Sequence, residues 1–285
     1  MSFLRFRQIA LLGTVVLATL NPTRDNQAHS RENDESSSVA HGERIIAQEA
    51  ATPSPELVSV QINYDFNNRI GPFSTGSASS LTFTPTVPIR INSEWNIVSR
   101  STIPLVMTEG IFPGFGHARG LSNIQQSFFL SPVPKDPTLF WGIGPTFFLP
   151  TATSRKVGSL QTGSGLAFGI LKAEGPFVFG LRLSQVWPVA GPVPIGLKPI
   201  NFVYAEPMAS YTTKDGWTYT LSAENVYDWN TSKLLVPINF TIEKLVMIQD
   251  KPINFLVGAR FFAASPHDGP KGWGARIGMT ILPFK

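Results

Sequence analysis

Long stretches of strict two-residue alternation constrain the fold of this chain more than any other feature. In residues 58–67 an apolar side chain stands at every even position and a polar one at every odd position. Similar runs cover 81–91, 217–224, 234–243 and 274–281. Because successive side chains of a strand point to opposite faces, these runs predict β-strands with one apolar and one polar face.

The runs are also long. The strands that contain them are expected to last about 10–13 residues, whereas strands of globular proteins are usually about 5–6 residues and membrane-spanning strands need about 9–11. A half-buried strand of a soluble protein has the same two-faced pattern. Length therefore favours membrane-spanning strands, while alternation alone leaves a soluble β fold open.

The connections between the runs alternate in length. Short turns fall near 92–94, 132–137, 173–175, 212–216 and 248–251, about forty residues apart. Mostly longer connections lie between them, at 67–77, 108–119, 151–161, 188–198, 227–232 and 264–271. Outer-membrane barrels have this asymmetry of short periplasmic turns and longer external loops. A propeller blade would place four short strands in forty residues, and these runs are too long for that.

Twelve strands follow from this punctuation. They are expected near 57–66, 78–91, 95–107, 120–131, 139–150, 162–172, 176–187, 199–211, 217–226, 233–246, 252–263 and 272–284. With an even number of strands, the first strand begins and the last strand ends on the same side of the barrel, and we expect this to be the short-turn, periplasmic side. Prolines inside these strands donate no ladder hydrogen bond and should mark bulges or strand ends; they are Pro85, Pro88, Pro104, Pro145, Pro207 and Pro237.

The first residues of the chain predict export. Arg5 and Arg7 precede an uncharged apolar run at 9–20 that is too short to span a membrane. We therefore expect a signal peptide over 1–20. A polar segment over 21–55 is expected to be a disordered linker, and 56–285 to form the barrel.

Composition removes several classes of function. Without cysteine there is no disulfide, thiolate zinc site or cysteine nucleophile. The four histidines lie far apart in sequence, and the net charge of +4 includes no basic run. We expect no metal, no cofactor and no nucleic-acid partner. The small residues Gly163, Gly165 and Gly169 share one strand face, and no helix follows them as a phosphate loop would require.

Tryptophans gather at the ends of the predicted strands. Trp95, Trp141, Trp217 and Trp273 each follow a turn or loop, and Trp187 ends a strand. Trp at strand ends is what the interfacial girdles of a membrane barrel require, and ordinary packing near turns is the alternative.

Several stretches resemble a family of bacterial outer-membrane barrels related to channel proteins linked to phenol and toluene degradation, often mislabelled neuromedin U. They are 60–64 (VQINY), 95–100 (WNIVSR) with Pro104, 127–132 (SFFLSP), 141–153 (WGIGPTFFLPTAT), 215–217 (DGW) and 282–285 (LPFK). The resemblance spans nearly all of 57–285 and implies an outer-membrane barrel with a transport role. It carries over no ligand or catalytic residue. One departure is that Phe284 is penultimate, whereas many such barrels finish on an aromatic residue read by the assembly machinery.

If the apolar faces meet lipid, the polar faces line the lumen. The candidate lumen-lining and solute-binding residues are then Arg90, Arg100, Arg182, Arg260, Arg276, Asp65, Glu206, Glu224 and Glu243. Arg in the middle of the lipid face would cost about 2–4 kcal/mol, which favours the inward assignment. These charges could form rings that sort solutes or ion pairs that fill a narrow barrel. A barrel of about eight strands has a packed interior and one of about sixteen has an open channel, so a strand number of twelve leaves both alternatives open.

Catalysis is not expected. Acyl transfer by a serine needs a histidine base within hydrogen-bond reach, and His117 and His267 both fall in long connections. Nothing around Ser122 or Ser127 resembles a nucleophile motif.

The sequence therefore predicts an all-β, antiparallel up-and-down transmembrane barrel in the bacterial outer membrane. We expect a channel or transporter for small solutes, hydrophobic ones among them. Its partners would be outer-membrane lipid, the barrel-assembly machinery and an unidentified solute. The alternatives are a plugged structural barrel without flux and a soluble, exported β-rich binding protein.

Overall fold

A computed structural model of the chain describes residues 42, 44–48, 51, 57–112, 114, 116–249 and 251–282. The predicted signal peptide over 1–20 lies outside these residues. The predicted linker is described only at 42, 44–48 and 51, which are helical, so the domain boundaries stay predictions. The chain divides into two compact units, Met1–Val39 and Ala40–Lys285, and only the second contains described residues. Within the described residues no helix has the length and apolarity to cross a membrane.

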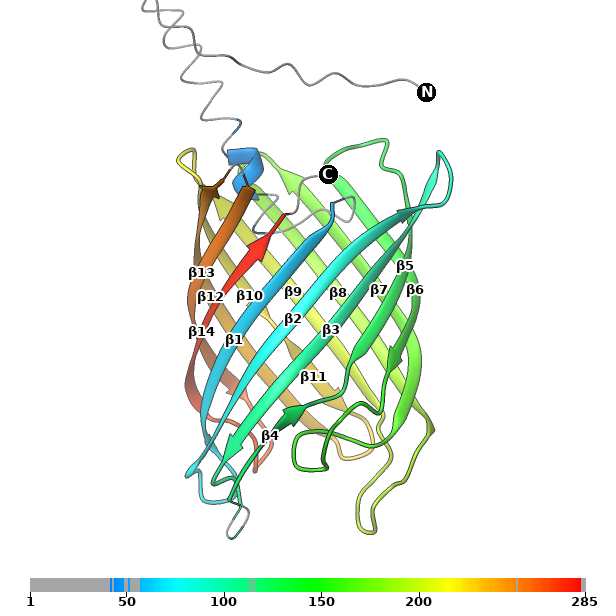
Figure 1. Ribbon diagram of the computed structural model, residues 1–285, viewed down its shortest axis with the longest axis vertical. Helices are drawn as coiled ribbons and strands as arrows, with labels where there is room; N and C mark the ends of the chain where they lie inside the picture. The colour runs from blue at the N-terminus through cyan, green and yellow to red at the C-terminus, as the bar shows by residue number, and fades with distance from the viewer. Residues whose placement is uncertain are drawn as a thin grey trace, which may run out of the picture. The chain divides into compact units, whose positions relative to one another are not determined.

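One antiparallel sheet accounts for all the strands (Figure 1). The strands are β1 (Ser59–Ile70), β2 (Gly76–Arg90), β3 (Trp95–Glu109), β4 (His117–Leu121), β5 (Gln125–Pro132), β6 (Leu139–Phe148), β7 (Thr162–Glu174), β8 (Phe177–Ala190), β9 (Phe202–Thr212), β10 (Trp217–Ala223), β11 (Asn225–Asp228), β12 (Lys233–Ile248), β13 (Lys251–Ala264) and β14 (Gly272–Ile281). Consecutive strands pair along the sheet, except that β4 does not pair with β5 nor β10 with β11, and β1 pairs with β14, which closes the sheet. The predicted up-and-down barrel is confirmed.

Two of the twelve expected strands are each broken into two pieces. β4 and β5 both pair with β3, and β10 and β11 both lie between β9 and β12. The barrel wall therefore has twelve positions although fourteen pieces are counted. The second break falls at Glu224, whose N–H donates to the carbonyl of Pro237 (3.2 Å).

Prolines explain most of the irregularities in the ladder. The β2–β3 pairing stops around Pro85, and the β5–β6 pairing stops around Pro145. Pro104 and Pro207 lie opposite the β4/β5 and β10/β11 breaks, and the β12–β13 register shifts at Pro237. Pro88 differs from these five prolines, because it lies opposite Val98 within a continuous stretch of the β2–β3 pairing. Because proline has no N–H to donate, a closed barrel accommodates it where the ladder is already interrupted, as expected.

The connections differ in length between the two ends of the barrel. At one end β12 and β13 almost abut, whereas at the other end β6 and β7 are joined by 149–161. We call these the short-turn end and the long-loop end. The first connection is shorter than expected, since β1 continues to Ile70 through a bulge in which Arg69 has a positive φ of 55°. The polar run Asn67–Arg69 thus belongs to the strand, because a bulge tolerates residues that alternation would reject.

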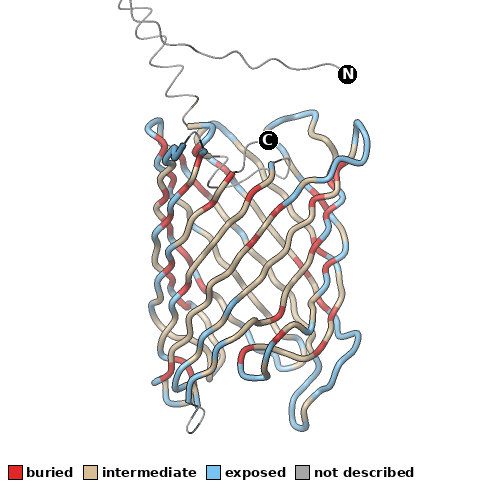
Figure 2. Tube along the Cα trace, in the orientation of Figure 1, coloured by how far each residue is buried: buried red, intermediate tan, exposed pale blue. Residues whose placement is uncertain are grey.

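Many large apolar side chains are exposed, and much of the buried set is polar. Figure 2 shows how buried, intermediate and exposed positions are distributed along the strands. In the middle of their strands, Leu221 and Val257 are 54% and 57% exposed. Thr146 and Asn254, on the opposite strand faces, are fully buried. A soluble monomer rarely exposes such a continuous apolar band, and a closed barrel satisfies its backbone without water. This inverted arrangement is that of a membrane-spanning barrel.

Tryptophans mark both edges of the apolar band. Trp95 and Trp141 stand at the short-turn end, with ring centroids 6.5 Å apart in an edge-to-face contact. Trp187 and Trp273 stand at the long-loop end and are 47% and 65% exposed. Their positions match the two interfacial girdles of an outer-membrane barrel.

Candidate functional site: the barrel lumen

Strand register decides which side chains face the lumen. Gln61 lies directly opposite Thr84 on β2 and Thr280 on β14, so the polar faces of adjacent strands form one continuous inner surface. The same register continues around the barrel. It brings together on that surface charged residues that lie far apart in sequence.

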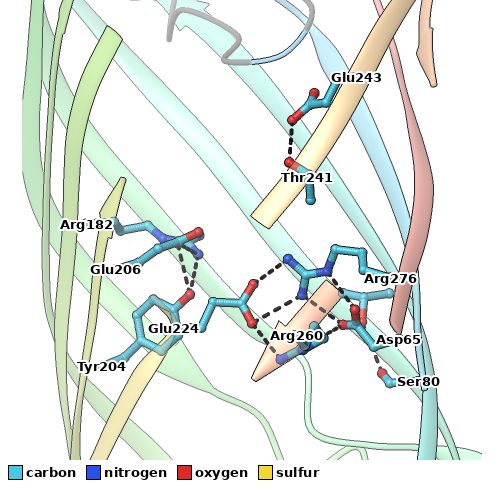
Figure 3. A network of polar contacts seen from close by, with 11 residues as sticks. Asp65, Ser80, Arg182, Tyr204, Glu206, Glu224, Thr241, Glu243, Arg260 and Arg276 are labelled. Atoms are coloured by element: carbon cyan, nitrogen blue, oxygen red, sulfur yellow. Dashed lines mark hydrogen bonds and ion pairs between the residues drawn. The ribbon is translucent and has the colours of Figure 1, made fainter. Parts of the chain in front are cut away.

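Four of these charged residues form a closed cluster (Figure 3). Arg276 donates from Nε and Nη2 to Asp65 at 2.6 and 2.9 Å, and its Nη1 contacts Glu224 at 2.8 Å. Arg260 bonds the same two acids, with Nη2 3.0 Å from Glu224 Oε2. Three of the four side chains are at most 10% exposed, and that of Glu224 is 21% exposed. Glu224 can reach both arginines because it sits at the break between β10 and β11.

A second group lies beside this four-charge cluster on β8 and β9. Arg182 pairs with Glu206, its register partner on the adjacent strand. The hydroxyl of Tyr204 donates to Glu206 at 2.9 Å and accepts from Arg182 at 3.0 Å. The strand face of Glu206 also carries Phe202 and Tyr204. Those rings share the inner surface with it.

Two further charged residues of the inner surface have no ion-pair partner. Arg100 makes one hydrogen bond, from Nη1 to the hydroxyl of Thr86 at 3.1 Å. The carboxylate of Glu243 accepts hydrogen bonds from Thr220, Thr241 and Asn254 at 3.0, 2.9 and 2.6 Å. These two residues belong to opposite parts of the wall, β3 and β12.

The structure thus groups eight of the nine predicted residues on the inner surface and leaves Arg90 apart. Arg90 is exposed at the last residue of β2, where its Nε donates to the carbonyl of Asn92 in the short turn. Residues at a strand end keep their face by alternation but lie outside the lumen. A solute-binding role for any of the nine stays a prediction.

Within the lumen is a cavity of about 240 Å³. One wall is polar and includes Gln61, Thr86, Thr241 and Glu243, and Arg100 also lines the space. The facing wall carries most of the apolar lumen-facing residues, namely Val98, Phe129, Phe140, Leu171 and Met208, with Gly142 and Gly169 between them. The polar residues Ser131, Arg182 and Glu206 line the cavity from the same part of the barrel, on β5, β8 and β9. The cavity can therefore accept a molecule with an apolar body and a polar group.

The apolar wall is what the sequence reasoning missed. Assigning polar faces to the lumen overlooked apolar side chains on the same faces. A signal was available, because Val98 shares its face with Asn96 and Arg100 at two-residue spacing. Phe129 likewise shares its strand face with Ser127 and Ser131 at two-residue spacing.

Neither a metal site nor a hydrogen-bonded serine–histidine pair is present among the described residues. No group of three or more His, Asp or Glu there could hold a metal ion. His267 is exposed and contacts Asp268 (2.8 Å), while the hydroxyl of Ser127 is bonded to that of Thr146 (2.8 Å). No hydrogen bond in the described part of the chain joins a histidine to a serine. That the chain is not an enzyme stays a prediction.

One acid outside the membrane has a shifted titration. Asp136, in the connection between β5 and β6, accepts hydrogen bonds from the side chain and backbone of Thr138 at 2.6 and 2.9 Å. Lys172 approaches it at 3.1 Å. These contacts lower the pKa of Asp136 to about 2, the Thr138 side chain contributing most.

The fold and this lumen define the class: a bacterial outer-membrane β-barrel. A crystal structure of the COG4313 outer membrane channel from Pseudomonas putida F1 is similar, with a TM-score of 0.63 and 11% identity over 82% of this chain and 97% of that one. Two further structures are more distant. The NanC porin has a TM-score of 0.47 and 11% identity over 80% of this chain and 100% of that one. Outer membrane phospholipase A from Escherichia coli has a TM-score of 0.45 and 8% identity over 81% of this chain and 98% of that one. No family model and no curated protein matches the sequence. The similarity to the first structure shows the fold alone.

Proposed function

We propose that this chain is an outer-membrane channel or transporter for small solutes, hydrophobic ones among them. The observation that carries this proposal is the lumenal cavity with one polar and one apolar wall. A barrel that served only as a scaffold would have no need of such a space. A mostly apolar pocket with a few placed polar groups is the usual form of a small-molecule site.

Membership of the phenol- and toluene-linked channel family is part of the proposal and rests on the sequence stretches quoted above. The short-turn end would face the periplasm, and the tryptophan girdles would contact outer-membrane lipid. The barrel-assembly machinery would insert the chain. The eight charged residues of the inner surface would line the route or bind the solute, and the exposed Arg90 would take no part.

A plugged barrel is the second candidate, and one observation favours it. The four-charge cluster has no net charge, pairs each arginine with both acids and is at most 21% exposed, so it could fill the lumen at its level. A soluble binding protein has no comparable support, because the exposed mid-strand apolar band would need a cover in water.

Planar-bilayer recording of the purified full-length chain separates the first two candidates. A channel should give discrete conductance steps. Arg100→Gln should shift its ion selectivity towards cations, and Glu224→Gln should shift it towards anions, because the lumenal charge changes in opposite directions. Arg90→Gln is the matched control and should change selectivity least. Absence of steps under all conditions would leave the plugged barrel.

A further inference from the structure

Among the four arginines of the inner surface, Arg100 is the one whose guanidinium contacts no carboxylate of the described residues. A guanidinium offers five N–H donors in a planar fork. In Arg100 a single donor is engaged, by the Thr86 hydroxyl, and Nε is buried without an acceptor. Arg182, Arg260 and Arg276 each contact at least one carboxylate. A buried charged donor without an acceptor is costly, so Arg100 is prepared for a partner that the described part of the chain does not supply.

No acid of the lumen is available to satisfy it. Glu206 is the acid that acts on Arg100 electrostatically, and it is already paired with Arg182. Arg182 also acts on Arg100, with like charge. Glu243 lines the same cavity, but its carboxylate already accepts three hydrogen bonds from neutral donors. An incoming anion would therefore find its free partner at Arg100.

The surroundings of Arg100 add an apolar requirement. Val98 lies two residues along on the same strand face, and its register partner is Phe129. These two side chains are 4% and 8% exposed. Gly142 and Gly169 are paired beside them, and a Cβ at Gly169 would have Phe129 as its nearest neighbour at 4.0 Å. Gly169 thus leaves room beside the apolar wall that a side chain would occupy, whereas a Cβ at Gly142 would lie 3.0 Å from that of Phe129.

We infer that the lumenal cavity binds apolar monocarboxylates, with the carboxylate on Arg100 and the apolar body against Val98 and Phe129. This inference rests on the proposed channel function and names its solute class. A planar carboxylate matches the guanidinium fork, and burial strengthens the pair. A neutral apolar solute would gain the same wall and leave the guanidinium unpaired.

Calorimetric titration tests this with the full chain in lipid nanodiscs. The probes are 4-butylbenzoate and its neutral counterpart 4-butylbenzamide, with empty nanodiscs as the blank for partition into lipid. Wild type should bind the carboxylate roughly 10- to 100-fold more tightly than the amide, as expected for hydrogen bonds to a charged group. Arg100→Gln should abolish that preference. Arg90→Gln, which removes the exposed arginine outside the cavity, should preserve it.

A second variant keeps the result interpretable if Arg100→Gln folds poorly. Gly169→Leu adds a side chain to the apolar wall and should weaken binding of both probes while the carboxylate preference remains. Equal binding of the two probes by wild type, no binding of either, or an unchanged preference in Arg100→Gln would overturn the inference.

Conductance of the same preparations separates this inference from the proposed function. A wild-type chain that conducts but does not prefer the carboxylate would refute the site and leave the channel standing. One that binds the carboxylate but never conducts or releases it across a liposome membrane would refute the channel and leave the site.

Discussion

Removing Asp65 from the four-charge cluster should destabilise the barrel strongly. Asp65→Asn keeps the size of the side chain and removes its charge. Three contacts are affected: those from Nε and Nη2 of Arg276, at 2.6 and 2.9 Å, and that from Arg260. The two arginines, 8% and 9% exposed, would then share Glu224 as their single counter-charge.

The expected loss of unfolding free energy is about 3–5 kcal/mol, the range for breaking a buried ion pair from one side. Glu224→Gln should cost less than Asp65→Asn, because the Glu224 side chain is 21% exposed against 10% for Asp65. Arg276→Gln in the Asp65→Asn background restores neutrality, leaving Arg260 with Glu224. The double variant should therefore lose less than the sum of the single losses, by roughly 0.5–3 kcal/mol.

Urea unfolding of the chain refolded into liposomes, followed by tryptophan fluorescence, measures these differences. The exposed pair of Lys172 and Asp136 is the matched control, and its double-mutant cycle should show little coupling because both side chains are about half exposed. Strict additivity of Asp65→Asn and Arg276→Gln would refute the cluster as a mutually dependent unit.

Three further outcomes follow from the structure. Thr138→Val should raise the pKa of Asp136 from about 2 towards its ordinary 3.8, and an NMR titration of the carboxyl measures this change. The folded-state pKa is the lower one, so any stability that the ionised Asp136 contributes is present above pH 4 and is lost as the pH falls through about 2. Val257→Arg, in the middle of the lipid face, should cost about 2–4 kcal/mol in the urea assay, and Leu139→Arg at a strand end about 0–1 kcal/mol. Gly144→Ala should cost about 1–3 kcal/mol there, since its Cβ would collide with a carbonyl of β5.

Each of these has a control that fixes its meaning. Lys172→Met should raise the pKa of Asp136 less than Thr138→Val, since the threonine hydrogen bonds contribute more. Gly169→Ala should be tolerated, because the nearest atom to the added Cβ is 4.0 Å away. Equal losses for the two arginine substitutions would contradict the lipid-facing band, and equal losses for the two alanine substitutions would contradict the close strand contact at Gly144.

Alternation and punctuation predicted the strands well because they are local. A run such as 58–67 fixes which residues share a face whatever the rest of the chain does, and the turns fix the order of the strands. The two strand breaks could not be predicted this way. They depend on Pro104 and Pro207 in neighbouring strands, so they become visible only once the register is known.

The candidate site was predictable in its members but not in its contacts. Assigning the polar strand faces to the lumen places Asp65 and Arg276 there, but no local sequence feature indicates that the two side chains contact each other. Their pairing is a consequence of closure, which brings β14 beside β1 across 211 residues of sequence. Arg90 was placed with them because alternation carries no information on depth along a strand. The apolar wall around Phe129 was missed because an apolar side chain carries no local mark of lipid or lumen.

Fractionation of cells that express the full chain tests the central claim most directly. The account predicts that the mature protein stays in the outer-membrane fraction, needs detergent for extraction and migrates faster on a gel before boiling than after. Such a shift is expected of a closed barrel that resists unfolding in detergent. Recovery in the periplasm or medium without detergent, with no change on boiling, would contradict the membrane-spanning barrel and every lumenal assignment built on it.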